Sequence, residues 1–229
     1  MKNKEMINKL KDNAELAQAA YGYFHLANPR YDFNKDSTDK ERLEYFREKI
    51  AKNQTAIPTP EDILNMEHKY FKDNNGKPKD SWYHKHFFDG DFSPLQSKRF
   101  FEKYDLLEHC SNTESGFSAT LFQNKETKEY ALAIRGTEFK LDQIKDLIND
   151  YHIGTNNDDL DKVVEQYFDM LLFYEETIKP LMQEKGITRI NVVGHSLGGY
   201  LTQLFALSYS HIINEVYTYN TSLESKKAA

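Results

Sequence analysis

The segment with the clearest chemical potential is GHSLG, Gly194 to Gly198, in which a serine stands between two glycines at G-x-S-x-G spacing. The segment INVV, in which three of four residues are β-branched, precedes it, and a helical pattern, LTQLFAL, follows it. A strained strand-to-helix turn can raise a serine hydroxyl above the edge of a sheet, where it acts as a nucleophile. Side chains at the two glycine positions would press on neighbouring backbone. The pattern predicts Ser196 as a nucleophile, and the alternative is an ordinary strand–turn–helix junction.

A serine nucleophile also needs N–H groups that stabilise the negatively charged oxygen of the intermediate. One expected donor is the next residue, Leu197, at the N-terminus of the following helix. The other is expected at the end of a different strand, and Thr137 in AIRGTEF stands just past the apolar run YALAI. Taken alone, RGT also fits a β-turn with a surface arginine. We expect the Ser196 hydroxyl to be exposed with Thr137 beside it. A buried hydroxyl, or a Thr137 far from the turn, would remove the basis for hydrolase chemistry and leave only a generic sandwich of helices around strands.

The second half of the chain contains the elements that would position these residues. The runs GFSATLFQN and EYALAIRG, joined by KETKE, indicate a β-hairpin. RINVV and NEVYTY indicate further strands, and each follows a helical segment. This alternation from Tyr130 onward predicts an α/β fold, a mostly parallel sheet flanked by helices. In the helix expected after Asp158, the apolar stripe predicted to be buried is Val164, Phe168, Leu171, Ile178 and Met182.

The first half of the chain differs in composition. Apolar residues at three- and four-residue steps predict an amphipathic helix over about residues 4–26, and charged helices are expected around 40–52 and 60–71. Aromatic residues are concentrated in residues 70–104, which indicates either a core or a lipid-accepting cleft or lid. We therefore expect a helical, charged region over residues 1–115 packed on the core, an α/β core over 116–220, and a polar tail over 221–229.

Composition excludes several classes of function. The 229 residues carry a formal net charge of −6 and no basic block, so we expect no nucleic-acid partner. The single cysteine cannot form an intrachain disulfide. No apolar run reaches the ~18 residues of a membrane span, and the N-terminus has no apolar signal core. The default expectation is a cytoplasmic protein without a transmembrane segment, although export by a signal-less route would leave no mark.

In this order, LAIRGTE, DLINDY and INVVGHSLGGYLTQLFAL resemble the class 3 (fungal-type) lipases of the α/β-hydrolase superfamily. The resemblance covers about Gly116 to Asn220 and implies a partial α/β-hydrolase fold. It implies that Ser196 is the nucleophile, that Thr137 and Leu197 form the oxyanion hole, and that the substrate is a lipid ester, mainly an acylglycerol or phospholipid. It implies no cofactor and no metal. The elbow residues that it implies are Gly194, His195, Gly198 and Gly199.

The catalytic partners of the serine are not found where this fold places them. The triad runs in the order Ser, Asp, His along the chain, yet the 33 residues after Ser196 contain no aspartate and one histidine, His211. A regular helix of fifteen residues at ~1.5 Å each would place His211 about 22 Å from the serine. His195 is expected to point away, and His152 reads as a loop residue. His84 and His86, near Asp89 and Asp91, fit a hydrated loop better than a metal site.

The simplest expectation is that the last strands, with the catalytic aspartate and histidine, are absent. The predicted strand at Glu215 to Tyr219 would then be an exposed edge that invites self-association or a complementing chain. The first hypothesis is a serine ester hydrolase with impaired turnover. The second is a catalytically silent lipase-like module that binds acyl lipid or a protein partner, and the third is a poorly folded gene remnant.

Overall fold

The computed structural model describes residues 2–33, 36–70, 92–136 and 158–219. These form two compact units, one of Met1–Tyr21 with Leu106–Ala229 and one of Gly22–Asp105. The boundary expected at residue 115 stays a prediction, but the unit that carries the sheet also takes in the N-terminal helix. The polar tail at 221–229 lies outside the described residues. Each unit is considered by itself.

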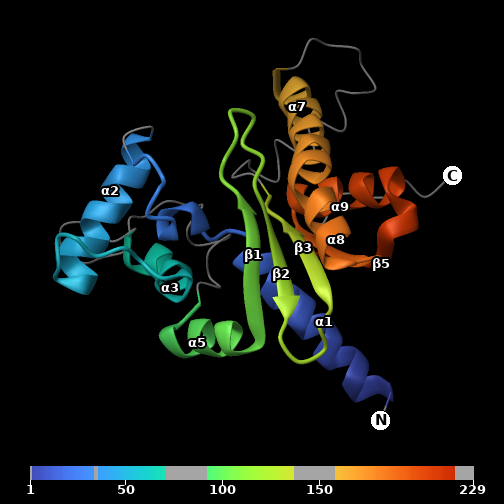
Figure 1. Ribbon diagram of the computed structural model, residues 1–229, viewed down its shortest axis with the longest axis horizontal. Helices are drawn as coiled ribbons and strands as arrows, with labels where there is room; N and C mark the ends of the chain where they lie inside the picture. The colour runs from blue at the N-terminus through green and yellow to red at the C-terminus, as the bar shows by residue number, and fades with distance from the viewer. Residues whose placement is uncertain (1, 34–35, 71–91, 137–157, 220–229) are drawn as a thin grey trace, which may run out of the picture. The chain divides into compact units, whose positions relative to one another are not determined.

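The first unit is built on a five-stranded sheet in the order β1-β2-β3-β4-β5 (Figure 1). Strands β2 and β3 pair antiparallel, with Leu121 opposite Leu132, which confirms the predicted hairpin. Strands β3, β4 and β5 pair in parallel, as the strand and helix alternation predicts. The sheet is therefore mixed, and the α/β fold class is confirmed. The strand bounds are Tyr104–Cys110 for β1, Ala119–Asn124 for β2, Tyr130–Ile134 for β3, Ile190–His195 for β4 and Ile213–Tyr219 for β5.

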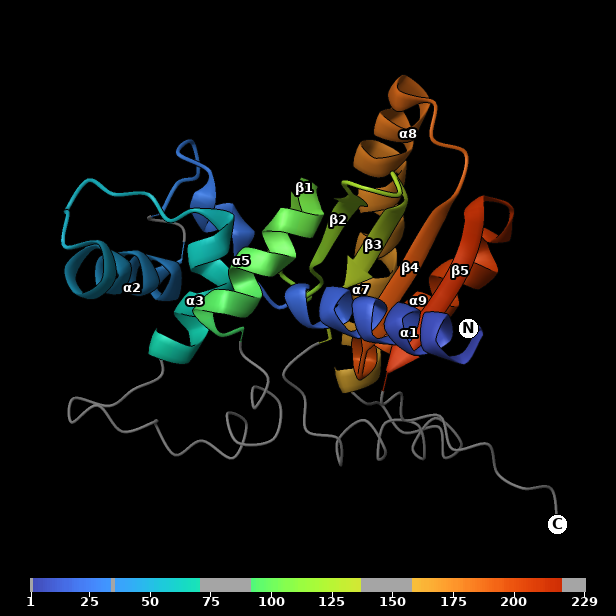
Figure 2. The same ribbon diagram turned by 90° about the horizontal axis from the view of Figure 1, so that it is seen from below.

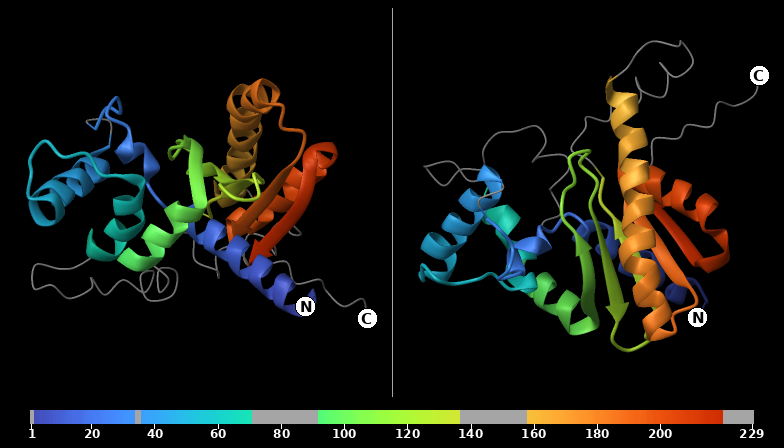
Figure 3. Two further views of the ribbon diagram at one scale, coloured as in Figure 1. Left: turned by 60° about the horizontal axis from the view of Figure 1, so that its bottom comes forward. Right: turned by 45° about the horizontal axis from the view of Figure 1, so that its top comes forward.

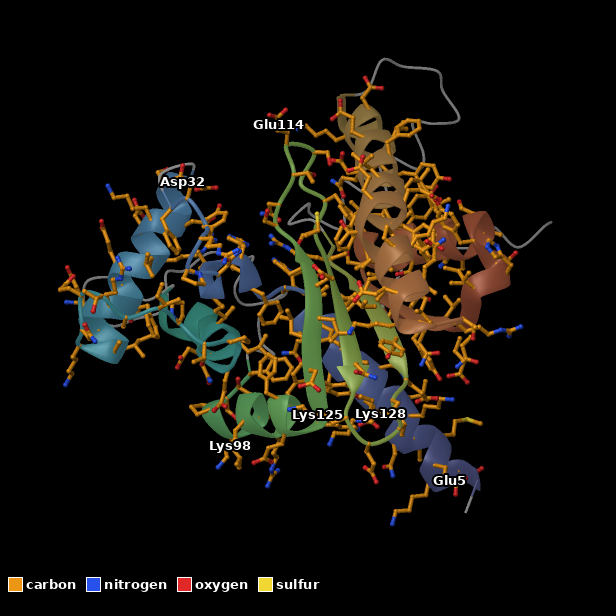
Figure 4. All side chains as sticks on the ribbon, in the orientation of Figure 1. Glu5, Asp32, Lys98, Glu114, Lys125 and Lys128 are labelled. Carbon is orange, nitrogen blue, oxygen red and sulfur yellow. The ribbon has the colours of Figure 1, made fainter. Side chains whose placement is uncertain are left out.

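The turn between β2 and β3 is closed by local polar contacts. Asn124 Oδ1 accepts hydrogen bonds from the backbone N–H groups of Glu126 and Thr127 at 2.9 and 3.1 Å. Lys128 adopts a positive φ of 61°, which lets its N–H donate to the Asn124 carbonyl at 2.9 Å. The charged segment KETK is thus held at one end of the sheet, where Lys125 and Lys128 are labelled in Figure 4.

Helices cover both faces of this sheet. Helix α1 (Lys2–Ala19) contacts β3, β4 and β5, and Figure 2 shows it crossing these strands in front of the sheet. Helix α9 (Leu197–Ser208) contacts the same three strands and also packs against α7 (Asp158–Phe173). Figure 3 shows α7 and α1 on opposite sides of the sheet. The other helical elements of this unit are η3 (Tyr174–Ile178), α8 (Lys179–Lys185) and η4 (Ser210–Ile212).

The core of the first unit lies between the sheet and the helices α7 to α9. Strand β4 is buried at every position from Ile190 to Gly194, because helices cover it on both faces. This burial explains why three of the four residues of INVV are apolar, and the fourth, Asn191, is a buried polar residue that accepts a hydrogen bond from Asn214. The fully buried side chains of this core cluster include Leu121 of β2, Leu132 of β3, Met170 of α7, Leu201 and Phe205 of α9, and Phe117, which precedes β2.

The apolar stripe predicted for α7 is partly wrong. Ile178 and Met182 are buried, but Val164 and Phe168 are 44% and 61% exposed. On the N-terminal side of Ile178, the buried positions are instead Val163, Gln166, Met170 and Tyr174. The reason is the π-helical turn at Tyr174–Ile178, which adds one residue to a turn and shifts the preceding stripe back by one position. A regular 3.6-residue period cannot reveal that shift.

The second unit is helical, as predicted for this region. Its described helices are η1 (Phe24–Ala27), α2 (Ser37–Tyr45), η2 (Phe46–Ala51), α3 (Pro60–Tyr70) and α5 (Pro94–Lys103). In the first unit, the helix expected over residues 4–26 is α1, which ends at Ala19. Helix α5 begins with a capping box, in which the Ser93 side chain accepts from the Gln96 N–H. In the described part of the aromatic-rich segment, Phe92, Phe100 and Tyr104 are buried. Phe92 meets Phe100 edge to face, and the ring of Tyr104 is tilted against Phe100.

A buried carboxylate organises part of the second unit. Asp39 is 4% exposed and lies 2.8 Å from His25 Nε2. It also accepts from Tyr31 Oη at 2.9 Å and from Arg42 at 3.0 Å. Burial alone would raise the pKa of Asp39, but the hydrogen bonds from His25 and Tyr31 and the charge of Arg42 lower it. The guanidinium of Arg42 also lies 3.6 Å from the centre of the Tyr23 ring, so both the Asp39 carboxylate and the Tyr23 ring stabilise this cation.

Candidate functional site

Ser196 lies at the strained turn between β4 and α9. Its backbone has φ 54° and ψ −126°, a conformation that residues with a side chain rarely adopt. Such strain persists only where the surrounding structure holds it, and here backbone hydrogen bonds hold both the N–H and the carbonyl of Ser196. The Ser196 N–H donates to the Tyr219 carbonyl at 3.0 Å, and its own carbonyl accepts from the N–H groups of Gly199 and Tyr200. The strand–turn–helix junction expected from the sequence is confirmed, while the nucleophilic role of Ser196 stays a prediction.

Three glycines allow the backbone to pack closely around this turn. A Cβ on Gly194 would lie 2.3 Å from the Gly198 carbonyl oxygen. A Cβ on Gly198 would lie 2.3 Å from the Ile134 oxygen and 2.7 Å from the Gly136 nitrogen. On Gly136 it would lie 2.7 Å from the His195 oxygen. These are backbone atoms that cannot rotate away, so the end of β3 is pressed directly against the turn at Ser196.

The expected oxyanion donors are only partly described. Leu197 is 2% exposed. Because it is the first residue of α9, its N–H is one of the groups at the helix start that have no intrahelical acceptor. Thr137 lies outside the described residues. Its neighbour Gly136 does lie against the turn, with its added Cβ position 3.3 Å from the Gly198 nitrogen. The proximity of β3 to the turn was expected, whereas the roles of Leu197 and Thr137 stay predictions.

The expectation that the Ser196 hydroxyl is exposed is wrong. Ser196 is 1% exposed, and among the described residues its Oγ has no hydrogen-bond partner. Sequence spacing can place a serine on a turn but does not report what covers it. A buried hydroxyl counts against direct attack from this conformation, so chemistry at Ser196 requires the space above it to open. Thr202 Oγ1, on α9, is also buried without a described partner.

His195 is held by a residue that the sequence does not single out. Its Nδ1 lies 3.1 Å from the hydroxyl of Tyr21, which follows α1 by two residues. Burial lowers the pKa of His195, so the ring is kept neutral near pH 7. Tyr21 and His195 are 174 positions apart, and no local pattern predicts a contact over that distance. The elbow residues Gly194, His195, Gly198 and Gly199 all lie at this junction.

The other histidines give no described base for Ser196. His211 lies in η4, beyond the far end of the twelve-residue α9, as expected. His109 Nδ1 bonds to Thr120 Oγ1 at 2.9 Å. His152 and the group of His84, His86, Asp89 and Asp91 lie outside the described residues. Within the described ranges, no cluster of three or more His, Cys, Asp or Glu side chains could hold a metal ion.

Comparisons with known proteins agree with the sequence resemblance. Residues 131–220 match the model of the lipase (class 3) family. Among solved structures, the Lip2 lipase of Yarrowia lipolytica is 22% identical over 54% of this chain and 48% of its own, with a TM-score of 0.39. A lipase from Rhizopus microsporus var. chinensis is 15% identical over 61% and 52%, with a TM-score of 0.43. A nonglycosylated Yarrowia lipolytica LIP2 lipase is 17% identical over 93% and 58%, with a TM-score of 0.48.

The chain spans about half the length of these solved lipases. No curated protein sequence matches it closely. No helix in the described part of the chain is long and apolar enough to cross a membrane.

Proposed function

We propose, on the premise that residues 131–220 are a segment of the class 3 lipase family, that this chain is a serine carboxylic-ester hydrolase acting on lipid esters. The observation that carries the proposal is the backbone of Ser196, at φ 54° and ψ −126° between a parallel strand and the start of α9. That conformation is rare for serine, and three glycines and the Tyr219 carbonyl maintain it. An ordinary junction between a strand and a helix does not need such strain.

In the proposed reaction, Ser196 Oγ attacks the carbonyl carbon of the ester and forms a covalent bond to it. The hydroxyl proton passes to a base, and the carbonyl oxygen becomes an oxyanion. The N–H groups of Leu197 and Thr137 would donate to that oxygen, each stabilising the transition state by ~2.7–4 kcal/mol. The alcohol leaves after taking up a proton, and water then hydrolyses the acyl group from Ser196.

This scheme needs a base, and turnover is expected to be impaired for want of one. Ser196 Oγ has no hydrogen-bond partner among the described residues, so no described group is in place to take its proton. Loss of the activating groups typically lowers kcat about 10⁶-fold, while an oxyanion hole and binding alone retain about 10³–10⁴ over water. We expect this chain to turn over far more slowly than an enzyme with all its activating groups, and the part of its rate above that of the oxyanion hole and binding alone to depend on Ser196.

A second polypeptide could supply the missing groups at the edge of the sheet. Strand β5 stands last in the strand order, so among the described residues its outer edge has no strand partner. Val216 on this strand is 40% exposed, and Leu10, whose carbonyl accepts from Tyr219 Oη, is 45% exposed. If a second copy of this chain is the partner, the rate of hydrolysis per mole of chain should rise with protein concentration. The rise should occur over the same concentrations at which light scattering detects dimers. A monomer with constant specific activity would exclude this route.

The hydrolase proposal is tested by turnover of p-nitrophenyl esters of short and long acyl chains. Wild-type protein should hydrolyse them faster than buffer, and Ser196→Ala should lower the rate to what the oxyanion hole and binding alone provide. Ser210→Ala is the matched control, because Ser210 is exposed in η4 beyond α9 and should retain full activity. Equal rates in wild type and Ser196→Ala, with both folded, would exclude Ser196 as the nucleophile.

The burial of Ser196 favours a second candidate, a catalytically silent module that binds acyl lipid or a protein partner. In this case the strained turn is a structural remnant of a lipase and its hydroxyl remains covered. Binding of a fluorescent fatty acid would then be unchanged by Ser196→Ala, and no excess ester hydrolysis would be measured. Hydrolysis that depends on Ser196 would reject this candidate.

A further inference from the structure

Tyr21 lies at a junction of three elements beside the strained turn. It follows α1, and its N–H donates to the Gln18 carbonyl at 3.2 Å, which closes the helix. Its hydroxyl reaches His195 Nδ1, at the end of β4, and the two rings meet edge to face with centres 6.2 Å apart. The guanidinium of Arg135, at the end of β3, lies 5.9 Å from the centre of the Tyr21 ring.

Gly136 shows how closely these elements approach one another. A Cβ added there would lie 2.7 Å from Tyr21 Oη and 2.7 Å from the carbonyl oxygen of His195. The tyrosine hydroxyl, the strand that leads to Thr137 and the residue before Ser196 are therefore in direct contact. The close packing around Gly136 therefore involves both Tyr21 and the backbone of His195.

We propose that Tyr21 is a positioning residue for Ser196. The Tyr21 hydroxyl donates to Nδ1 of His195 and so fixes the residue that precedes the strained turn. A backbone at φ 54° is kept only where its neighbours hold it in place. His195 is the neighbour on the strand side, and its side chain is anchored by Tyr21. The N-terminal segment therefore contributes to the site through the turn that follows α1. This inference rests on the proposed function for its effect on reactivity, but not for the contact itself.

The contact with Tyr21 also determines the tautomer and the function of His195. A ring whose Nδ1 accepts from Tyr21 carries its proton on Nε2 when it is neutral. Burial keeps it neutral, because a charged imidazole is costly to place away from water. Among the described residues no group bonds to Ser196 Oγ, so His195 is not in position to act as its base. Its contribution is to anchor the turn.

The contact is tested directly by ¹⁵N NMR of histidine-labelled protein, with the His195 signal assigned by its loss in His195→Asn. Wild-type His195 should be in the Nε2–H form and should not titrate near pH 6.5. In Tyr21→Phe, the tautomers should mix and the Nδ1 signal should shift. The control is Tyr217→Phe, which removes a hydroxyl bond to Glu215 elsewhere in the same unit and should leave His195 unchanged.

The effect on reactivity is measured with a fluorophosphonate probe, separating the probe's affinity from the first-order rate of Ser196 modification. Loss of one hydrogen bond worth about 0.5–1.5 kcal/mol predicts a rate lowered about 2- to 12-fold in Tyr21→Phe, with affinity unchanged. Tyr217→Phe should react like wild type.

The two proposals can fail separately. If wild type is not modified at Ser196 but its histidine spectrum changes in Tyr21→Phe, the hydrolase proposal fails and the positioning contact stands. If Tyr21→Phe reacts at the wild-type rate, or leaves the His195 spectrum unchanged, the positioning role is overturned. Should Tyr21→Phe not fold, the wild-type spectrum decides, because an equal mixture of tautomers excludes the bond.

Discussion

Replacement of Gly198 by alanine tests whether β3 is pressed against the turn at Ser196. The new Cβ would lie 2.3 Å from the Ile134 oxygen, and ordinary contact begins at 3.4 Å. The shortfall is 1.1 Å (3.4 − 2.3), and it falls on backbone atoms of the sheet. Overpacking of this kind costs about 1–3 kcal/mol, and three close backbone contacts place this site at or above the upper end. Alanine gains ~1 kcal/mol of helix propensity, so the net loss is at least about 2 kcal/mol.

Thermal unfolding measures this loss. A net destabilisation of about 2 kcal/mol corresponds to a Tm lower by about 4–8 °C for a unit of this size. Modification of Ser196 by a fluorophosphonate should fall in parallel, because the turn must move to relieve the clash. Leu207→Ala is the control on the same helix, since Leu207 is 79% exposed and its loss should change stability by less than about 0.5 kcal/mol. A Gly198→Ala variant as stable as wild type, or more stable, would refute the close contact between β3 and the turn.

Two further predictions concern buried ionisable groups. Because burial lowers the folded-state pKa of His195, the unfolded chain binds more protons below its usual pKa near 6.5. Urea unfolding should therefore show stability decreasing as pH falls from about 7 to 5, and His195→Asn should flatten that part of the profile. Asp39→Asn should destabilise the second unit by about 3–5 kcal/mol, because it leaves the buried cation of Arg42 without its carboxylate. Glu44→Gln, at an exposed position of the same helix, should change little in the same urea titration, and equal effects would contradict the role of Asp39.

Much of the fold could be predicted from local patterns. INVV followed by GHSLG predicts the strand, the strained turn and the helix, because the glycines leave few other conformations for that spacing. The hairpin follows from two β-rich runs and a charged turn. Strand β1 was not expected, because YDLLEHC alternates charged and apolar residues too irregularly to stand out.

The remaining features depend on contacts that are distant in sequence. The π-helical turn at Tyr174–Ile178 moves the buried face of α7 by one residue. The spacing of the apolar residues does not predict this turn. Tyr21 meets His195 only after α1 crosses the sheet. The exposure of Ser196 is set by the atoms that pack over it, so the sequence predicted the turn correctly and its accessibility wrongly.

The most direct test of the central claim, that Ser196 on its strained turn is the nucleophile, is mass mapping of a fluorophosphonate adduct on the folded chain. Because Ser196 is buried, modification should be slow and limited by opening of the space above it. We predict a single adduct on the peptide that contains Ser196, absent in Ser196→Ala and retained in Ser210→Ala. A folded protein that acquires no adduct after prolonged exposure, or one whose adduct persists in Ser196→Ala, would contradict the claim.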